Sequence, residues 1–83
     1  MNSTFFKNKK ILITGGTGSF GKAMTTRLLK DMVKEIRIFS RDEKKQDDMR
    51  KEFNDSKIKF YIGDIRDAES VERAVEGIDF IFH

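Results

Sequence analysis

The chain is distinctive first for the residue types that it lacks. It contains no cysteine, which excludes disulfide bonds and thiolate-ligated zinc. It has a single histidine, His83, and no cluster of residues spaced like metal ligands, so we expect no metal site. Proline is absent as well, and no internal repeat, low-complexity segment or linker divides the 83 residues. The chain is therefore expected to form one continuous folding unit.

Long apolar runs are also missing. No segment approaches the roughly 18 consecutive apolar residues that a membrane-spanning helix needs, so no membrane span is expected. The start of the chain, Met1 to Lys10, has neither an apolar core nor a small-residue cleavage site and is not typical of a secretory signal. Together with the absence of cysteine, these features favour a cytoplasmic protein.

Charge of one sign is not concentrated in any part of the chain. The formal net charge is +3, but basic and acidic residues are interspersed, as they are across residues 41–45. A nucleic-acid-binding protein more often carries its basic residues along one face, so we expect no nucleic-acid partner. The charged run at residues 41–52 is typical of a solvated helix face.

Short apolar runs bounded by glycine or polar residues predict four strands. Lys10–Thr14 has the length and the β-branched content of a strand buried on both faces, as in parallel sheets, and it ends abruptly at Gly15. Two further strands are predicted at residues 35–40 and 57–62, and a fourth begins within residues 79–83.

Helical periodicity fills the segments between these strands. The first helix carries one apolar stripe at 3.6-residue spacing, formed by Phe20, Met24, Leu28, Leu29 and Met32. A polar helix over residues 43–53 has Met49 and Phe53 as its only clear apolar contacts. A third helix is capped by Asp67 and ends at Gly77. Its inner face is formed by Val71, Ala74, Val75 and Ile78.

The element order is βαβαβαβ, which predicts an α/β fold. Strands joined by helical crossovers are parallel, and such crossovers are right-handed almost without exception. The expected result is a doubly wound sheet of order 3-2-1-4, in a domain that covers residues 9–83 after a polar N-terminal extension at residues 1–8. We expect this sheet to be truncated, and the isolated chain to be either marginally folded or rescued by self-association along the apolar edge of residues 80–82.

Glycines at positions 15, 18 and 21 lie between the first strand and the first helix. Unpaired N–H groups and a partial positive charge at a helix N-terminus stabilise a pyrophosphate, and this context predicts a Rossmann-type phosphate loop. We expect Gly15 to allow the tight turn, Gly18 to leave room for the phosphate, and Gly21 to let the helix pack closely. The hydroxyls of Thr17 and Ser19 are expected to donate to phosphate oxygens and to cap the helix. The alternative is a flexible turn that binds no ligand.

The residues after the second strand predict which dinucleotide binds. NAD-specific sites place an acid about 20 residues beyond the glycines, where it accepts hydrogen bonds from the ribose hydroxyls. Ser40 and Arg41 stand there instead, and a hydroxyl beside a guanidinium suits a 2′-phosphate. Lys44 or Lys45 adds a second cation. The sequence therefore favours NADP(H) over NAD(H).

Some residues near this position have two possible roles. Asp42 either binds a ribose or caps the next helix, and Arg41 has a plain surface ion pair with Asp42 or Glu43 as its alternative. After the third strand, Asp64 is placed to accept from an adenine amino group, and the N–H of Ile65 to donate to the ring. A cap of the following turn is the alternative role for Asp64.

Four segments of the sequence resemble one protein family: TGGTGSFGK at residues 14–22, IFSRDEKKQDDMR at 38–50, FYIGDIRD at 60–67 and DFIFH at 79–83. They are similar to segments of the extended short-chain dehydrogenases/reductases, and within these to the UDP-N-acetylglucosamine 4,6-dehydratases of bacterial surface-polysaccharide synthesis. The SRDE segment most resembles the inverting members, which couple 4,6-dehydration to 5-epimerisation. Some members of this branch are labelled UDP-glucose 4-epimerases.

The resemblance implies a tightly held NADP(H) and UDP-N-acetylglucosamine as the substrate. A hydride leaves sugar C4, water is eliminated across C5–C6, and the hydride returns to C6. The implied cofactor contacts are Thr17, Gly18, Ser19, Phe20, Ser40, Arg41, Asp42, Glu43, Lys44, Lys45, Asp64 and Ile65. The family's catalytic groups lie beyond position 83, so no catalytic residue is assigned, and Tyr61 and His83 are not expected to be catalytic.

Three functional hypotheses follow from the sequence. The chain is the N-terminal, NADP-binding part of a nucleotide-sugar dehydratase, and we expect the 83 residues to be inactive alone and the enzyme to be a homo-oligomer. Alternatively, it belongs to a related NADP reductase or 4-epimerase, or it is a non-catalytic dinucleotide-binding module. A downstream YxxxK-type motif favours an enzyme.

Overall fold

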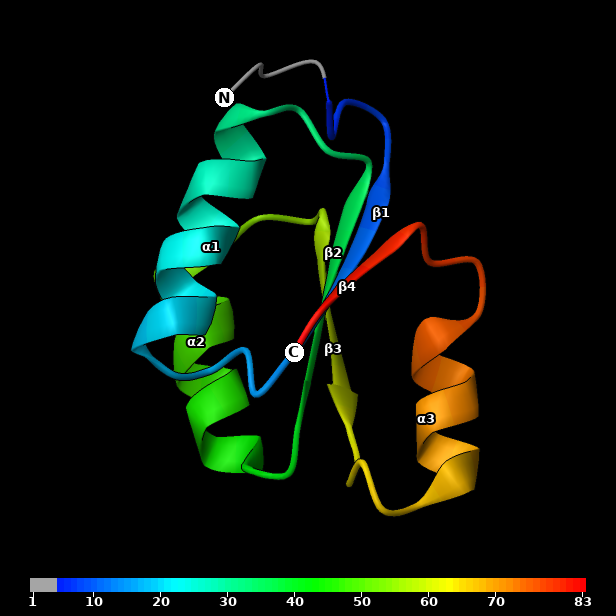
Figure 1. The fold of residues 1–83 in the computed structure, drawn as a ribbon. Helices are drawn as coiled ribbons and strands as arrows, with labels where there is room; N and C mark the ends of the chain where they lie inside the picture. The colour runs from blue at the N-terminus through cyan, green and yellow to red at the C-terminus, as the bar shows by residue number, and fades with distance from the viewer. Residues whose placement is uncertain (1–4) are drawn as a thin grey trace.

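The computed structural model describes residues 5–83, in which strands and helices alternate regularly (Figure 1). The elements are β1 (Lys10–Thr14), α1 (Ser19–Lys30), β2 (Glu35–Ser40), α2 (Glu43–Phe53), β3 (Ile58–Ile62), α3 (Ala68–Val75) and β4 (Phe80–Phe82). The predicted βαβαβαβ order is confirmed, and the predicted strand ends agree with the observed ones to within one residue.

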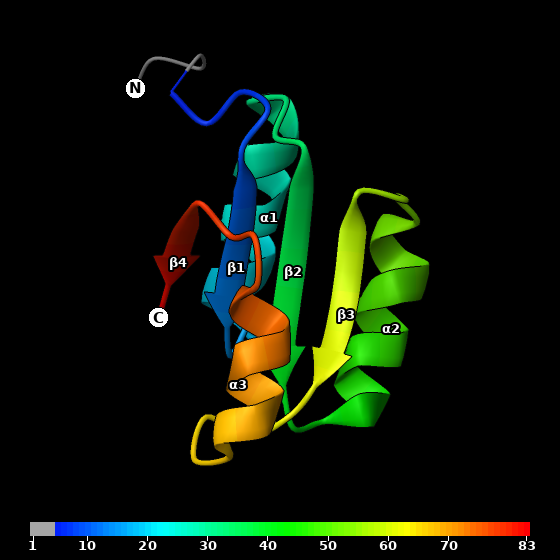
Figure 2. The same cartoon turned by 90° about the vertical axis from the view of Figure 1, so that its right-hand side faces the viewer.

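The four strands form one parallel sheet of order β3-β2-β1-β4, which confirms the predicted doubly wound topology. Figures 1 and 2 show α1 and α2 on one face of this sheet and α3 on the other. Because all strands run in the same direction, their carboxyl ends share one edge. The loops that follow β1, β2 and β3 therefore meet at that edge.

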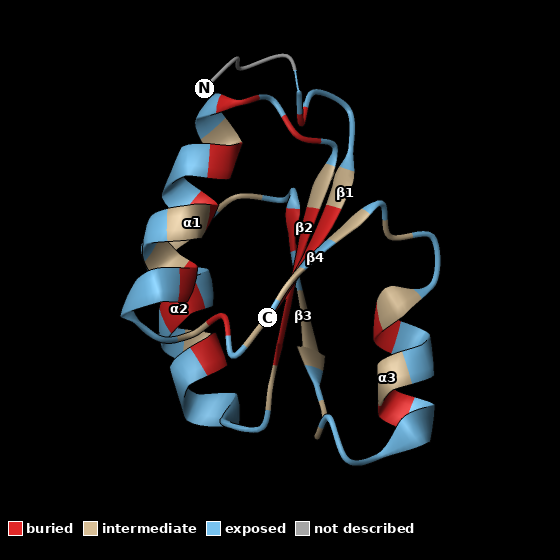
Figure 3. Ribbon diagram, viewed as in Figure 1, coloured by how far each residue is buried: buried red, intermediate tan, exposed pale blue. Residues whose placement is uncertain are grey.

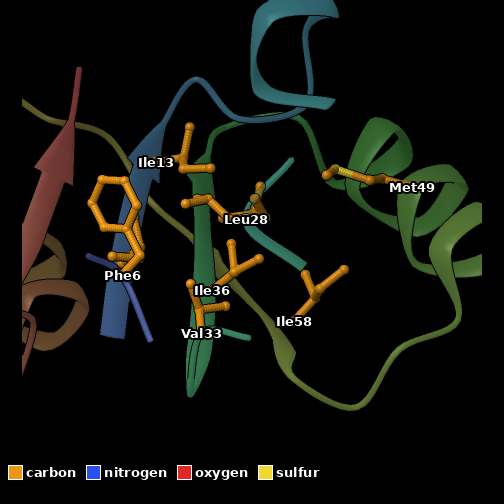
Figure 4. Close-up of a cluster of buried hydrophobic side chains, with 9 residues drawn as sticks. Phe6, Ile13, Leu28, Val33, Ile36, Met49 and Ile58 are labelled. Atoms are coloured by element: carbon orange, nitrogen blue, oxygen red, sulfur yellow. The ribbon is translucent and has the colours of Figure 1, made fainter. Parts of the chain in front are cut away.

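The central strand β1 forms the core of the molecule. Alternate side chains of a strand point to opposite faces, and both faces of β1 are covered. Ile11 and Ile13 are fully buried in the cluster beneath α1 and α2, in which Figure 4 labels Ile13. Figure 3 shows the buried stretch of β1 in red. Leu12 points the other way and packs with Phe39 and Ala74 beneath α3. The prediction of a strand buried on both faces is confirmed.

Helix α1 buries only the middle of the predicted apolar stripe, where Leu28 is fully buried and Met24 and Leu29 pack against the core. Phe20 is 63% exposed and Met32, which lies beyond the helix in a left-handed conformation, is 59% exposed. The buried positions are Gly21, Thr25 and Leu28. The small residues let the helix approach the rest of the domain closely, and the Thr25 hydroxyl is satisfied by the Gly21 carbonyl at 2.8 Å. The predicted stripe was therefore wrong at both of its ends.

The chain before β1 contributes to the core through Phe6. This side chain is buried and packs edge-to-face against Phe80 and Phe82 of β4, with ring centroids 5.4 and 5.9 Å away. Phe5 lies beside the same cluster, 4.8 Å from Phe6, but is mostly exposed. The segment that was described as a polar extension thus covers one face of β4.

The predicted helix signals lie where they were expected. Asp67 caps α3 by accepting from the Glu69 N–H at 3.3 Å, and Gly77 follows the helix with φ +76°. At α2 the Asp42 carboxylate accepts from the Lys45 N–H at 3.0 Å. No helix within residues 5–83 is both long enough and apolar enough to cross a bilayer.

An arginine of the sheet caps the C-terminal end of α3. Arg37 of β2 is buried and donates to the carbonyl oxygens of Ala74 at 2.9 Å and Glu76 at 2.6 Å. Its charge is balanced by Glu35, and its guanidinium lies over the ring of Tyr61, 5.4 Å from the centroid. Because helix carbonyls at the C-terminus carry a partial negative charge, this contact stabilises α3.

Candidate functional site

A cavity of about 470 Å³ opens at the edge where the carboxyl ends of the strands meet. The ends of β1, β2, β3 and β4 all contribute to its wall. It is lined by Thr14, Gly15, Phe39, Ser40, Arg41, Gly63, Asp64, Ile65, Arg66 and His83. This is the place where a doubly wound sheet binds its ligands, because the loops diverge there and leave a crevice.

The glycine loop lies at the mouth of this cavity, between β1 and α1. Gly15 has φ +64°, a left-handed conformation that a side chain rarely adopts, so the predicted tight turn is observed. Its N–H donates to the Phe39 carbonyl at 2.8 Å, which ties the loop to β2. The Gly18 N–H donates back to the Gly15 carbonyl at 3.3 Å and closes the turn.

The other two predicted glycines serve different purposes. A Cβ added to Gly18 meets only the Gly15 carbonyl oxygen, at 3.8 Å, so the fold itself does not require glycine there. A Cβ on Gly21 overlaps the backbone of Gly16, so this glycine allows the close approach between helix and loop. Because the fold does not require glycine at position 18, the lack of a side chain there is consistent with space for a ligand.

The first turn of α1 keeps its backbone N–H groups free. Gly18 is the N-cap and has no side chain to accept from them, and the first turn contains no acid. Neither the Thr17 nor the Ser19 hydroxyl bonds to this turn within residues 5–83, so the prediction that they cap the helix was wrong. The uncapped turn therefore retains its attraction for an anion.

A second, shallower hollow adjoins the glycine loop at the β2–α2 corner. It is lined by Thr17, Ser40, Arg41, Asp42, Glu43 and Lys45. Of the two candidate lysines, Lys45 lies on this hollow, whereas Lys44 pairs with Asp48 at 3.2 Å. Asp42 adopts its alternative role as a helix cap. Hydroxyl, guanidinium and ammonium groups thus meet beside the phosphate loop.

An ion cluster joins the two walls of the cavity. Arg41, after β2, lies 3.6 Å from the Asp64 carboxylate after β3, so it pairs with neither Asp42 nor Glu43. Arg66 contacts the same carboxylate at 2.7 Å. The hydrogen bonds from Arg66, with the charge of Arg41, hold the pKa of Asp64 far below its usual range. Asp64 also raises the pKa of Arg66.

Both readings of Asp64 find support in this geometry. Its carboxylate accepts from the Arg66 N–H at 2.9 Å and so caps the following turn. It also lies in the cavity wall beside Ile65, where an adenine amino group would need it. The Arg66 side chain donates hydrogen bonds to both carboxylate oxygens of Asp64, and this side chain is 77% exposed.

Several lining residues were missed by the sequence reasoning. Thr14 is the last residue of β1, Phe39 is the next-to-last of β2, and Gly63 directly follows β3, so the strand pattern alone was enough to place them at the cavity. Gly63 has no room for a Cβ, which would lie 2.7 Å from Phe39 and from Ser70. His83 is held by the Thr14 hydroxyl, at 2.6 Å from Nδ1.

Comparison with known proteins agrees with this architecture. A family model described as "Polysaccharide biosynthesis protein" matches residues 11–83. The UDP-glucose 4-epimerase of Rickettsia prowazekii is 57% identical over 82 residues, which cover 94% of this chain and 24% of that protein. The chain thus spans about a quarter of the length of the curated relatives it matches.

Two solved structures share the fold. Pen from Bacillus thuringiensis superposes with a TM-score of 0.91 at 46% identity, over 95% of this chain and 24% of that one. The Bordetella bronchiseptica enzyme WbmF, in complex with NAD+ and UDP, superposes with a TM-score of 0.76 at 19% identity, over 96% and 23%. The latter likeness shows the fold alone. On the family match over residues 11–83, the chain belongs to the polysaccharide biosynthesis protein family.

Proposed function

We propose that this chain binds NADP(H) as the cofactor-binding part of a nucleotide-sugar-modifying enzyme. The observation that carries the proposal is the meeting of an uncapped helix N-terminus with Ser40, Arg41 and Lys45 around one hollow. The first feature suits the pyrophosphate of any dinucleotide, and the second suits the additional phosphate of NADP(H).

The pyrophosphate is assigned to the loop from Gly15 to Gly21. Its support is the free N–H groups in the first turn of α1, the absence of an acid there, and the open space at Gly18. Thr17 and Ser19 supply hydroxyls that make no capping bond and are free to donate to phosphate oxygens. The exposed ring of Phe20 is assigned to the same ligand as an apolar contact.

The 2′-phosphate of the adenosine ribose is assigned to Ser40, Arg41 and Lys45. No carboxylate ends β2, so the group that selects NAD(H) by accepting from two ribose hydroxyls is missing. Glu43 lines the same hollow but lies in the first turn of α2, where an acid is stabilised by the helix. WbmF is described with NAD+, but its distant likeness carries no information on the residues of this corner.

The adenine is assigned to the wall formed by Asp64 and Ile65. For Asp64 to accept from the adenine amino group, Arg66 must give up some of its hydrogen bonds to the Asp64 carboxylate. When Arg41 binds the phosphate, its ion pair with Asp64 is broken as well. The exposed Ile65 side chain offers an apolar surface for the ring. When bound in this site, NADP supplies hydride transfer to and from a substrate carbon, while these residues hold and orient it.

For the whole protein we propose a UDP-N-acetylglucosamine 4,6-dehydratase with 5-epimerase activity, acting as a homo-oligomer in surface-polysaccharide synthesis. The second candidate is a UDP-glucose 4-epimerase, which the name of the 57% identical relative favours. Dehydration gives a product that is one water lighter than the sugar nucleotide, whereas epimerisation leaves the mass unchanged. Mass spectrometry of the products that the whole protein forms from either nucleotide sugar distinguishes the two reactions.

The cofactor assignment is tested with Arg41→Ala. Loss of one charge-assisted contact costs about 1.5–3 kcal/mol, so we expect roughly tenfold to a hundredfold weaker binding of NADP(H), with NAD(H) little changed. Arg73→Ala is the matched control, because Arg73 is exposed on α3 and reaches only Glu69, at 3.9 Å. Calorimetric titration of both cofactors is the measurement, and equal losses for the two would refute the assignment.

A further inference from the structure

Gln46 is a buried polar residue that no motif singled out. It lies in α2, is only 2% exposed, and faces the carboxyl ends of β2 and β3. Its side-chain nitrogen lies 3.0 Å from the Ser40 hydroxyl oxygen and 2.9 Å from the Tyr61 carbonyl oxygen. A longer contact of 3.4 Å reaches the Ser40 carbonyl. The amide thus connects α2 to the two strand ends that border the proposed ribose site.

These partners determine which way the Gln46 amide points. A carbonyl oxygen only accepts hydrogen bonds, so the group facing the Tyr61 and Ser40 carbonyls must be the NH₂ and not the amide oxygen. The same NH₂ group then donates to the Ser40 hydroxyl. If the amide were flipped by 180°, the Gln46 side-chain oxygen would face the carbonyl oxygens of Ser40 and Tyr61, which have no hydrogen to donate to it.

The direction of this bond has a consequence for Ser40. Because its oxygen already accepts from Gln46, the Ser40 hydroxyl has its hydrogen left to donate, and no acceptor for it occurs within residues 5–83. Ser40 borders both the main cavity and the adjoining hollow with Arg41 and Lys45. The free donor therefore lies beside two cations, where an anionic oxygen would complete its hydrogen bonding.

We propose that Gln46 is a positioning residue that fixes the Ser40 hydroxyl as a donor toward the 2′-phosphate and so contributes to the preference for NADP(H). This inference rests on the proposed NADP(H) site. Gln46 does not touch the ligand; it acts through Ser40. A ribose hydroxyl, which can donate as well as accept, depends less on the direction of the Ser40 bond than a phosphate, which presents acceptors to it.

A purely structural role for Gln46 predicts a different outcome. Its bond to the Tyr61 carbonyl joins α2 to β3, so a substitution is expected to lower the free energy of unfolding in any case. If that were its whole role, binding of both cofactors would fall together and the presence of Ser40 would make no difference.

A double-mutant cycle in the full chain separates the two roles. The variants are Gln46→Met, Ser40→Ala and the combination of both, with NADP(H) and NAD(H) affinities measured by calorimetry and unfolding followed in parallel. We expect Gln46→Met to weaken NADP(H) about threefold to tenfold more than NAD(H), and to add no such difference once Ser40 is alanine. Gln46→Asn, whose amide is too short to reach Ser40, replaces Gln46→Met if the latter does not fold.

The failures of the two proposals are distinguishable. Equal losses for both cofactors, or a selective loss that persists in the Ser40→Ala background, would overturn the role of Gln46 while leaving the NADP(H) site in place. A wild-type chain that does not prefer NADP(H) would overturn the proposed function, and the role of Gln46 with it.

Discussion

Individual glycines in the phosphate loop have separable roles. Gly21 is required by packing, since a Cβ there overlaps Gly16, whereas Gly18 has extended backbone angles and open space around it. A Cβ at position 18 meets only the Gly15 carbonyl oxygen, at 3.8 Å, so we expect a side chain there to disturb the fold less than one at position 21 and to enter the space assigned to the pyrophosphate. The two positions form a natural pair for comparing stability with binding.

We predict that Gly18→Val abolishes dinucleotide binding while leaving the circular dichroism spectrum largely unchanged. Gly21→Ala is the matched comparison and is expected to lower the melting temperature because helix and loop must separate. Binding is measured by titration and folding by thermal denaturation. A Gly18→Val protein that still binds would show that the phosphate lies elsewhere.

At the scale of elements, the sequence predicted most of the secondary structure correctly, but it misplaced the two ends of the apolar stripe on α1. Strand β1 and the caps at Asp42 and Asp67 were predictable because they depend on local chemistry. The part of the buried face of α1 formed by Gly21 and Thr25 was not predictable in this way, because spacing rules search for large apolar residues such as Leu28.

The contact between Arg37 and α3 was also beyond the reach of pattern reading. A charged residue inside a strand usually indicates an exposed face, yet this one is buried because the carbonyls of Ala74 and Glu76 and the carboxylate of Glu35 satisfy it. Such an interaction joins residues far apart in the sequence, and no local propensity predicts it.

We predict that Arg37→Met destabilises the protein by about 3 kcal/mol, because it leaves Glu35 and two helix-terminal carbonyls without their partner. The Arg73→Ala variant, which loses only an exposed pair, should change stability by less than about 1 kcal/mol. Urea denaturation gives both values. Equal effects of the two substitutions would mean that Arg37 does not hold α3.

At the scale of the whole molecule, the candidate site was largely predictable because parallel strands bring their carboxyl ends to one edge. Gly15, Ser40, Arg41, Asp64 and Ile65 come together for that reason. The ion cluster with Arg66 and the burial of Gln46 depend on how loops and helices pack in three dimensions. Neither follows from the order of the elements.

Strand β4 is one of the two outer strands of the sheet, and its open edge is the surface through which we expect this chain to associate. Within residues 5–83, β4 pairs only with β1. Its Ile81 lies on the same face of the sheet as Leu12, which is the α3 face, and is 54% exposed. Phe6 covers the opposite face by packing on Phe80 and Phe82. An open strand edge with an exposed apolar side chain favours pairing with another chain.

We predict that the 83-residue chain self-associates as its concentration rises, and that Ile81→Lys reduces the association without loss of helical signal. A charge on an edge strand opposes strand pairing, and a substitution of Ile81 leaves the packing of Phe6 on Phe80 and Phe82 unchanged. Sedimentation velocity and circular dichroism provide the measurements. A stable monomer with a cooperative melt at high concentration would contradict the prediction.

The strand order also has a consequence for the sequence of events in folding. The middle strand, β1, meets β2 early in the chain, whereas its bond to the segment before β4 spans 69 residues, from Lys10 to Asp79. Contacts across long separations require loop closure first and form late. The phosphate loop is tied to β2 by the hydrogen bond from the Gly15 N–H to the Phe39 carbonyl, so we expect the loop to form before β4 pairs with β1. A nascent chain is therefore expected to acquire an anion-binding surface before its sheet is finished.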